Sequence, residues 1–268
     1  MKSIQKVQCD RPQVADHCRA QRAARQLFCI AGLCALIAYR ASGMDVQGAV
    51  SGSALEPKPF SASYQWKWSG ITVAVSTLEF AHKDGSTWSY RSRSEPRGIG
   101  RLYPMRPTLE STMSIDAAGV RPLHFVADDG LSTPARHSDV VFDWSAGRAR
   151  GVYSGVTVDM ALRGDEQDDL SAQIAMLLTL RAGRTPDHLS MIDKNTIRDY
   201  AYERLGEERI TTGIGPVDTV IYATHHEGSR RTTRFWCPAS HGYVPVKVQQ
   251  SNGDSVEWTM EIQSLTGE

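Results

Sequence analysis

Net charge, long apolar runs and metal-binding motifs are all missing from this sequence of 268 residues. Lys and Arg balance Asp and Glu at 30 each, and no fixed-period repeat occurs. His-Glu-x-x-His is absent, and no Cys/His pair has the spacing of a zinc site. The apolar run 27–38 is shorter than the roughly 20 residues of a membrane-spanning helix. These absences argue against a zinc enzyme and against a membrane-spanning chain.

The zero net charge conceals two segments of opposite sign. Residues 1–43 hold seven Lys and Arg against two Asp and Glu, whereas residues 44–268 hold 23 against 28. The mildly acidic body argues against nucleic-acid binding, which needs a basic face. Basic residues followed by an apolar run and then by Ala41-Ser42-Gly43 are typical of a secretory signal peptide. We therefore expect a signal peptide over 1–43, with an uncleaved anchor or a short amphipathic leader as the alternatives.

Cysteine is almost confined to this leader. Four of the five cysteines lie there, at Cys9, Cys18, Cys29 and Cys34. Only Cys237 remains after cleavage, so the mature chain can form no internal disulfide. Cys237 has no Cys-His signature, and we expect it to be a small packed hydrophobe.

One stretch after the leader predicts a helix, at about 168–182. Asp168 or Asp169 can accept hydrogen bonds from the first turn, with help from the hydroxyl of Ser171. Gly183 can adopt the left-handed conformation after the last turn, and Pro186 prevents the helix from resuming. The helix is apolar on more than one side, so we expect it to be covered on more than one side.

The remainder of residues 60–268 predicts strands. Short runs alternate apolar with polar residues between turn pairs such as Asp84-Gly85 and Asn252-Gly253. The expected strands cover 60–68, 71–80, 87–94, 109–115, 123–126, 138–142, 149–153, 156–160, 189–192, 196–205, 208–212, 217–226, 231–236, 243–249 and 255–262. Residues 44–59 predict a flexible linker. The expected fold of 60–268 is one mainly β domain, a strongly curved antiparallel sheet or incomplete barrel packed around one central α-helix.

Tryptophan and arginine provide the candidates for ligand binding. Trp68, Trp144 and Trp236 can line a cavity for an apolar or glycan ligand, although such residues also fill cores. Trp66 lies two residues before Trp68, so the two share one face of a strand. A run of arginines can receive anionic groups of lipid or polysaccharide, although exposed strand faces have the same composition: Arg91, Arg93, Arg97, Arg101 and Arg106.

Catalytic residues are harder to assign. If the protein is an enzyme, Glu110 and Asp143 are the candidates for an acid-base pair. The alternative for Asp143, which we favour, is an aspartate that bonds the following turn. Adjacent His225 and His226 point to opposite faces of a strand and cannot easily share a metal ion. No metal site or cofactor is predicted.

Several motifs, taken in their order along the chain, resemble the bacterial family of unknown function numbered 3108. They are Trp68-Ser69-Gly70-Ile71, Glu110-Ser111, Gly119-Val120-Arg121-Pro122, Phe142-Asp143-Trp144, Asp168-Asp169-Leu170-Ser171, Gly206 to Thr212, Phe235-Trp236 and Val244-Pro245-Val246. The resemblance covers roughly 60–262. It implies an exported envelope protein of a Gram-negative bacterium, which agrees with the leader, and it supplies no activity and no catalytic residue. Gly213 stands where the family pattern has a proline, which affects only a turn.

Our leading hypothesis is a non-catalytic periplasmic domain that binds a hydrophobic or amphipathic envelope component, either a lipid, a lipoprotein or a glycan. It depends on export, the apolar helix, the abundant tryptophan and the absence of a nucleophile motif. One alternative is a carboxylate-dependent hydrolase. The other is an envelope assembly module that presents strand edges to a partner protein.

Overall fold

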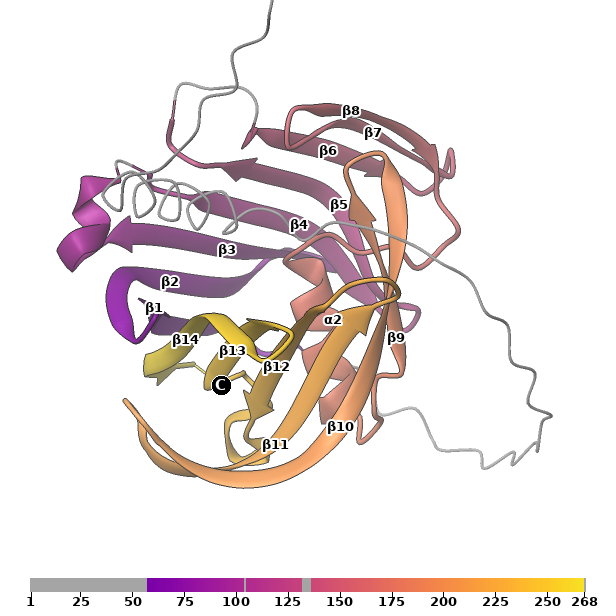
Figure 1. The fold of residues 1–268 in the computed structure, drawn as a ribbon. Coiled ribbons are helices and arrows are strands. Elements are labelled where there is room, and N and C mark those ends of the chain that lie inside the picture. Colours follow the sequence, from indigo (N-terminus) through magenta and orange to yellow (C-terminus); the bar gives the residue numbers. More distant parts are fainter. Residues whose placement is uncertain (1–56, 104, 132–135, 268) are drawn as a thin grey trace, which may run out of the picture. The chain divides into compact units, whose positions relative to one another are not determined.

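The protein is described by a computed structural model over residues 57–103, 105–131 and 136–267 (Figure 1). The expected signal peptide, 1–43, and residues 44–56 of the expected linker lie outside these residues. Pro57, Lys58 and Pro59 precede the first strand without regular structure.

Strands dominate the described part of the chain. They are β1 (Phe60–Trp68), β2 (Ile71–Asp84), β3 (Thr87–Pro96), β4 (Thr108–Asp116), β5 (Gly119–Asp128), β6 (Ser138–Asp143), β7 (Arg148–Tyr153), β8 (Val156–Ala161), β9 (His188–Asp193), β10 (Thr196–Thr212), β11 (Gly215–His226), β12 (Arg231–Cys237), β13 (Lys247–Asn252) and β14 (Ser255–Thr266). Among the described residues, the α-helix is α2 (Ser171–Arg181), and the 3₁₀ helices are η1 (Gly98–Leu102) and η3 (Ala239–His241).

All fourteen strands form one antiparallel sheet in the order β8-β7-β6-β5-β4-β3-β2-β1-β14-β13-β12-β11-β10-β9. Sequential strands are neighbours except β8 and β9, and the first and last strands, β1 and β14, pair side by side within the sheet. The sheet is not closed by strand pairing, and its edge strands are β8 and β9. Helix α2 belongs to the connection between these two edges (Figure 1). The expected mainly β, antiparallel fold is thus confirmed.

The long strand β10 differs from the expectation of two strands at 196–205 and 208–212. The pairing of β10 with β11 shifts register between Arg204 and Gly206, and Gly206 has a φ of +145°. A β-bulge with glycine lets the strand bend and continue where the sequence pattern indicates a turn. The expected strand 243–249 instead begins at Lys247, because the chain leaves η3 through Tyr243 with a φ of +61°.

The core is formed by alternate residues of the strands and by α2. Met176 of α2 packs with Tyr222 of β11 and with Cys237 of β12. The hydroxyl of Tyr90 on β3 donates to Gln173 of α2 at 3.4 Å. Cys237 is fully buried, as expected of a packed hydrophobe, and burial raises the pKa of its thiol. The largest fully buried side chains include Tyr64, Phe80, Met113, Phe125, Ile174, Leu177 and Ile262.

The two edges of the sheet approach each other. The backbone N–H of Asp159 on β8 donates to Asn195, in the turn between β9 and β10, at 3.3 Å. Between these edges, Gln167 forms a parallel bridge with Met191, and its N–H donates to the carbonyl of Ser190 at 2.8 Å. We call this junction of 163–167 with the edge strands the seam.

Candidate functional site

The three tryptophans expected to bind ligand lie in three different places. Trp68 is half-buried at the end of β1. Trp144 follows β6 and donates its indole N–H to the carbonyl of Pro122 at 2.6 Å. Trp236 is buried on β12 and donates to Glu208 at 2.7 Å. No ring contact among the described residues joins any two of them, so the structure does not bring these three together.

Trp66 pairs with Trp258 and not with Trp68. The centroids of the two rings are 4.8 Å apart. The indole N–H of Trp66 donates to Ser76 at 2.5 Å, and that of Trp258 donates to Gln250 at 3.1 Å. Because both polar ends already have protein partners, this aromatic pair is packed into the fold.

The two candidate catalytic carboxylates are far apart. Glu110 on β4 accepts two hydrogen bonds from the guanidinium of Arg91, at 2.7 and 3.0 Å. Asp143 accepts from the N–H of Ala146 at 2.9 Å, which is the turn-bonding geometry. The register of β4, β5 and β6 places Asp143 two strands across the sheet and four residues along it from Glu110. With the usual spacing between strands and rise per residue, their Cα atoms are about 16 Å apart. An acid-base pair of the glycosidase type needs roughly 5 to 10 Å.

A groove of about 300 Å³ lies on the outer face of β2 and β3, opposite the buried face of these strands. Val75 faces Glu95 across the two strands, and Thr77 faces Arg93. The residues that line the groove are Val75, Thr77, Glu79, Arg91, Arg93, Glu95 and Arg97. The groove therefore collects Arg91, Arg93 and Arg97 of the expected arginine run, whereas Arg101 and Arg106 do not line it.

Two of these arginines already have acidic partners. Arg91 donates through Nε and Nη2 to one oxygen of Glu110, Oε2, and Arg97 lies 3.1 Å from Glu95. Burial alone would raise the pKa of Glu110, but the hydrogen bonds and charges of Arg91 and Lys83 outweigh it and lower the pKa. A ligand would have to displace these partners in order to use either guanidinium.

Arg93 and Glu79 are the charges that remain. Neither has an ion-pair partner among the described residues, although Glu79 faces Arg91 across the strands. The reason is that Arg91 is held by Glu110 on the other neighbouring strand. The groove thus offers one unpaired cation and one unpaired anion on diagonal positions, whose Cβ atoms lie about 7 Å apart by sheet geometry.

After Arg97, which lines the groove, the chain continues directly into η1. The N–H of Arg97 donates to the carbonyl of Val73 at 2.8 Å, and Gly100 lies so close that a Cβ atom there would be 1.9 Å from the same oxygen. Only glycine allows η1 to pack this closely on β2. Exposed apolar side chains of β2 and η1 are Ile71 (54% exposed), Ile99 (50%) and Leu102 (82%).

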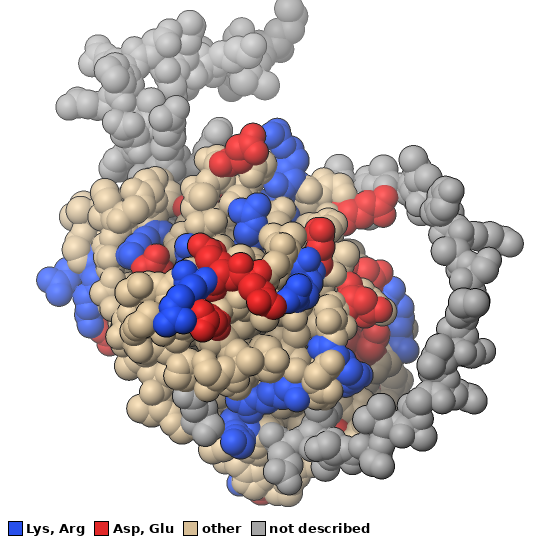
Figure 2. Space-filling view, turned by 90° about the horizontal axis from the view of Figure 1, so that it is seen from below, with Lys and Arg blue, Asp and Glu red and all other residues tan. Residues whose placement is uncertain are grey.

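On the face of the molecule shown in Figure 2, Lys and Arg lie among Asp and Glu without an extended region of one sign. Such a surface gives no footprint for a nucleic-acid backbone.

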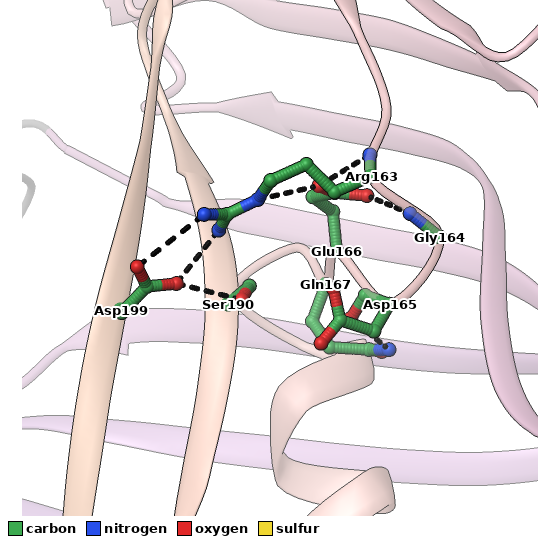
Figure 3. A network of polar contacts seen from close by, with 7 residues as sticks. All are labelled: Arg163, Gly164, Asp165, Glu166, Gln167, Ser190 and Asp199. Carbon is green, nitrogen blue, oxygen red and sulfur yellow. Dashed lines mark hydrogen bonds and ion pairs between the residues drawn. The ribbon is translucent and has the colours of Figure 1, made fainter. Parts of the chain in front are cut away.

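A second polar cluster holds the seam together (Figure 3). Glu166 is fully buried and accepts from the backbone N–H groups of Arg163 and Gly164, at 2.7 and 3.0 Å. The guanidinium of Arg163 also lies 2.7 Å from Asp199 on β10, to which Ser190 donates at 2.7 Å. Burial would raise the pKa of Glu166, but these donors outweigh it and lower the pKa. The cluster therefore ties the segment before α2 to the edge of the sheet.

Helix α2 begins at Ser171, three residues after the expected start, and Asp168 accepts hydrogen bonds at this start, as expected. Its Oδ1 accepts from the N–H groups of Leu170 and Ser171, each at 2.8 Å, and the hydroxyl of Ser171 accepts from the N–H of Asp168 at 2.8 Å. Its Oδ2 accepts from the hydroxyl of Ser111 on β4 at 2.6 Å. The side chain thus joins the helix to the sheet.

Asp169 has an unusual protonation equilibrium. Tyr153 donates to its Oδ2 at 2.6 Å. Burial raises the pKa of Asp169 to about 7, the bond from Tyr153 opposes this, and the charges of Asp168 and Asp193 add to the rise. The carboxyl can therefore take up a proton near neutral pH, but no nucleophile motif accompanies it.

The histidines lie as the strand geometry predicts. His225 is exposed, whereas His226 is buried with its ring 5.2 Å from that of Tyr200. No group of three potential metal ligands occurs among the described residues.

The sequence interpretation did not single out Glu79, Val75 or Thr77. Their signal was the alternation within 71–80, which places them on one face with the odd-numbered residues of 87–97 across the hairpin. The charge pairs of the groove could be assigned only with the third strand, β4, because Glu110 on β4 binds Arg91 and leaves Glu79 without an ion-pair partner among the described residues.

Comparison with known proteins supports the resemblance. Residues 63–260 match the family described as "Protein of unknown function (DUF3108)". No curated protein matches the sequence. None of the described helices has the length and apolar character needed to cross a membrane.

Among solved structures, the chain is similar to the β-barrel-like protein of the unknown-function family DUF1849 from Brucella abortus. The identity is 13% and the TM-score 0.50, over 79% of this chain and 98% of that one. It is also similar to the MucA/MucB complex structure of Pseudomonas aeruginosa, with 11% identity and a TM-score of 0.36, over 80% of this chain and 53% of that one. The first similarity shows a β-barrel-like fold.

Proposed function

The chain belongs to the DUF3108 family, and on that premise we propose that it is an exported, non-catalytic binding protein of the cell envelope. Its proposed ligand is an amphipathic envelope component. The proposed location is the periplasm, as the leader 1–43 suggests.

The groove on β2 and β3 carries this proposal. It combines guanidinium and carboxylate groups with the side chains of Val75 and Thr77. Directly after Arg97 of the groove, η1 exposes Ile99 and Leu102. Exposed apolar groups beside convergent polar groups are typical of surfaces that bind amphipathic molecules. A polar head in the groove and an apolar tail over η1 would use both.

The interior is the less favourable place for a ligand. In this proposal the curved sheet packs around α2 as a central helix, whose Met176 fills space against Tyr222 and Cys237. Trp66 and Trp258 are satisfied by protein partners. The groove therefore replaces the expected tryptophans as the proposed contact site.

The hydrolase alternative gains no support from geometry, because Glu110 is held by Arg91 and lies about 16 Å from Asp143 by strand spacing. The assembly-module alternative has the edge strand β8 in its favour, whose outward backbone groups are available to a partner strand. Its edge is short, six residues, and is partly occupied by the bond from Asp159 to Asn195.

The test is native mass spectrometry of the full chain, exported in a Gram-negative host and purified gently. Thr77→Trp would fill the groove, and Thr211→Trp is the control because Thr211 is exposed on β10, outside it. We expect an amphipathic molecule bound to the wild type and to the control, and little or none bound to Thr77→Trp. A ligand that is retained equally by all three proteins, or retained by none, would contradict the proposal.

A further inference from the structure

The unpaired charges of the groove indicate which kind of head group it accepts. Arg91 and Arg97 are neutralised by Glu110 and Glu95, so they contribute little to the selection of a ligand. The unpaired charges are then Arg93 and Glu79, which have opposite signs and no ion-pair partner in the described chain.

A head group with only negative charge would pair with Arg93 but would be repelled by the carboxylate of Glu79, which has no ion-pair partner among the described residues. A head group with only positive charge would pair with Glu79 but would be repelled by the guanidinium of Arg93. Like charges placed together cost affinity and discriminate against the wrong ligand. A head group that carries both charges satisfies both side chains at once.

Thr77 separates the two charges across the strands. Arg93 faces Thr77 on β2, and Glu79 is the next residue of β2 on the same face. The Cβ atoms of Arg93 and Glu79 are therefore diagonal neighbours, about 7 Å apart. A phosphate and an ammonium joined by a two-carbon link can span such a pair with the hydroxyl of Thr77 between them.

The chemistry of the cationic end is also selected. A carboxylate accepts N–H hydrogen bonds, which a primary ammonium can donate and a quaternary ammonium cannot. Quaternary ammonium groups are recognised by aromatic rings, and none of the described residues that line the groove is aromatic. The groove thus favours ethanolamine over choline.

We propose that the groove binds the head group of a zwitterionic phospholipid of the ethanolamine class, with its phosphate on Arg93 and its ammonium on Glu79. This rests on the proposed function, because it names the ligand of the same groove. The acyl chains would leave the groove past Ile99 and Leu102 of η1.

The experiment measures binding of the full chain to nanodiscs in which phosphatidylcholine is mixed with phosphatidylethanolamine or with phosphatidylglycerol, and to pure phosphatidylcholine. We expect roughly tenfold tighter binding to the ethanolamine lipid, the gain of about one charge-assisted hydrogen bond. Glu79→Gln should abolish the preference for ethanolamine over choline, and Arg93→Gln should weaken binding to every phospholipid. Arg234→Gln and Glu203→Gln, exposed on β12 and β10, are the charge-matched controls.

The outcomes separate this inference from the proposed function. Equal binding to the three lipids, or preference for phosphatidylglycerol, would overturn the head-group assignment while a block by Thr77→Trp would still support the groove. An ethanolamine preference that survives Glu79→Gln would also overturn it. Absence of binding to any lipid would overturn both.

Discussion

Replacement of Asp169 by Asn is expected to reduce the loss of stability between pH 5 and pH 8. Burial raises the pKa of Asp169 from 3.8 to about 7, with the charges of Asp168 and Asp193 adding to the rise and the bond from Tyr153 opposing it. The folded protein therefore keeps a proton that the unfolded chain releases at a lower pH.

The sign and size follow from this difference. Because the pKa is higher in the folded state, protonation stabilises the fold, and the free energy of unfolding falls as pH rises toward and through 7. For a shift of this size the fall is about 2.5 kcal/mol between pH 5 and pH 8. This figure is an upper value, because part of the surface of Asp169 is exposed to solvent, which screens the charge of its carboxylate. Asn cannot ionise and still offers Tyr153 an oxygen acceptor, so Asp169→Asn should lack this fall.

Urea unfolding followed by tryptophan fluorescence at pH 5, 6, 7 and 8 measures the effect. The control is Asp143→Asn: hydrogen bonds from Ser145 and Ala146 lower the pKa of this exposed carboxyl, so it is ionised throughout the range. A wild type whose stability rises with pH would refute the reasoning. An Asp169→Asn variant with the slope of the wild type would refute it equally.

Three further changes test the helix start, the seam and the groove. Asp168→Ala should cost about 3 kcal/mol in chemical unfolding, since three donors lose a buried acceptor; a loss below that of exposed Asp187→Ala would contradict this. Arg163→Met should speed hydrogen exchange at residues 190–192 while distant strands exchange as before, whereas unchanged rates would show that the guanidinium does not hold the seam. Gly100→Ala should displace η1 and weaken lipid binding in nanodiscs. Gly85→Ala strains its own backbone, at a φ of +50°, but its added Cβ contacts nothing, so it should leave η1 and lipid binding unchanged; equal effects would refute the steric argument.

Local signals predicted most of the fold. The hydrogen bonds of Asp168 at the start of α2 and the left-handed Gly183, with a φ of +70°, depend on neighbouring residues, and the sequence predicted both. Alternation gave most of the strands for the same reason. The bulge at Gly206 was missed because a polar glycine segment has the same composition in a turn and in a bent strand.

Contacts between residues far apart in the chain could not be predicted from the sequence. The contact between β1 and β14, and the seam that Arg163 forms with Asp199, join residues far apart in the chain. The candidate binding residues Trp68, Trp144 and Trp236 have similar local patterns, and only the pairing of distant strands shows that they lie in separate places. Likewise, Arg93 could be recognised as unpaired only after Arg91 was seen to bind Glu110.

The most direct test of the groove is photo-crosslinking of the full chain with a phosphatidylethanolamine that carries a diazirine in its acyl chain, followed by peptide mapping. We predict crosslinks within 71–79 and 97–103, which Thr77→Trp reduces and Thr211→Trp does not. Crosslinks concentrated in α2 or in β10–β12, unchanged by Thr77→Trp, would contradict a ligand in the groove and would place it inside the sheet.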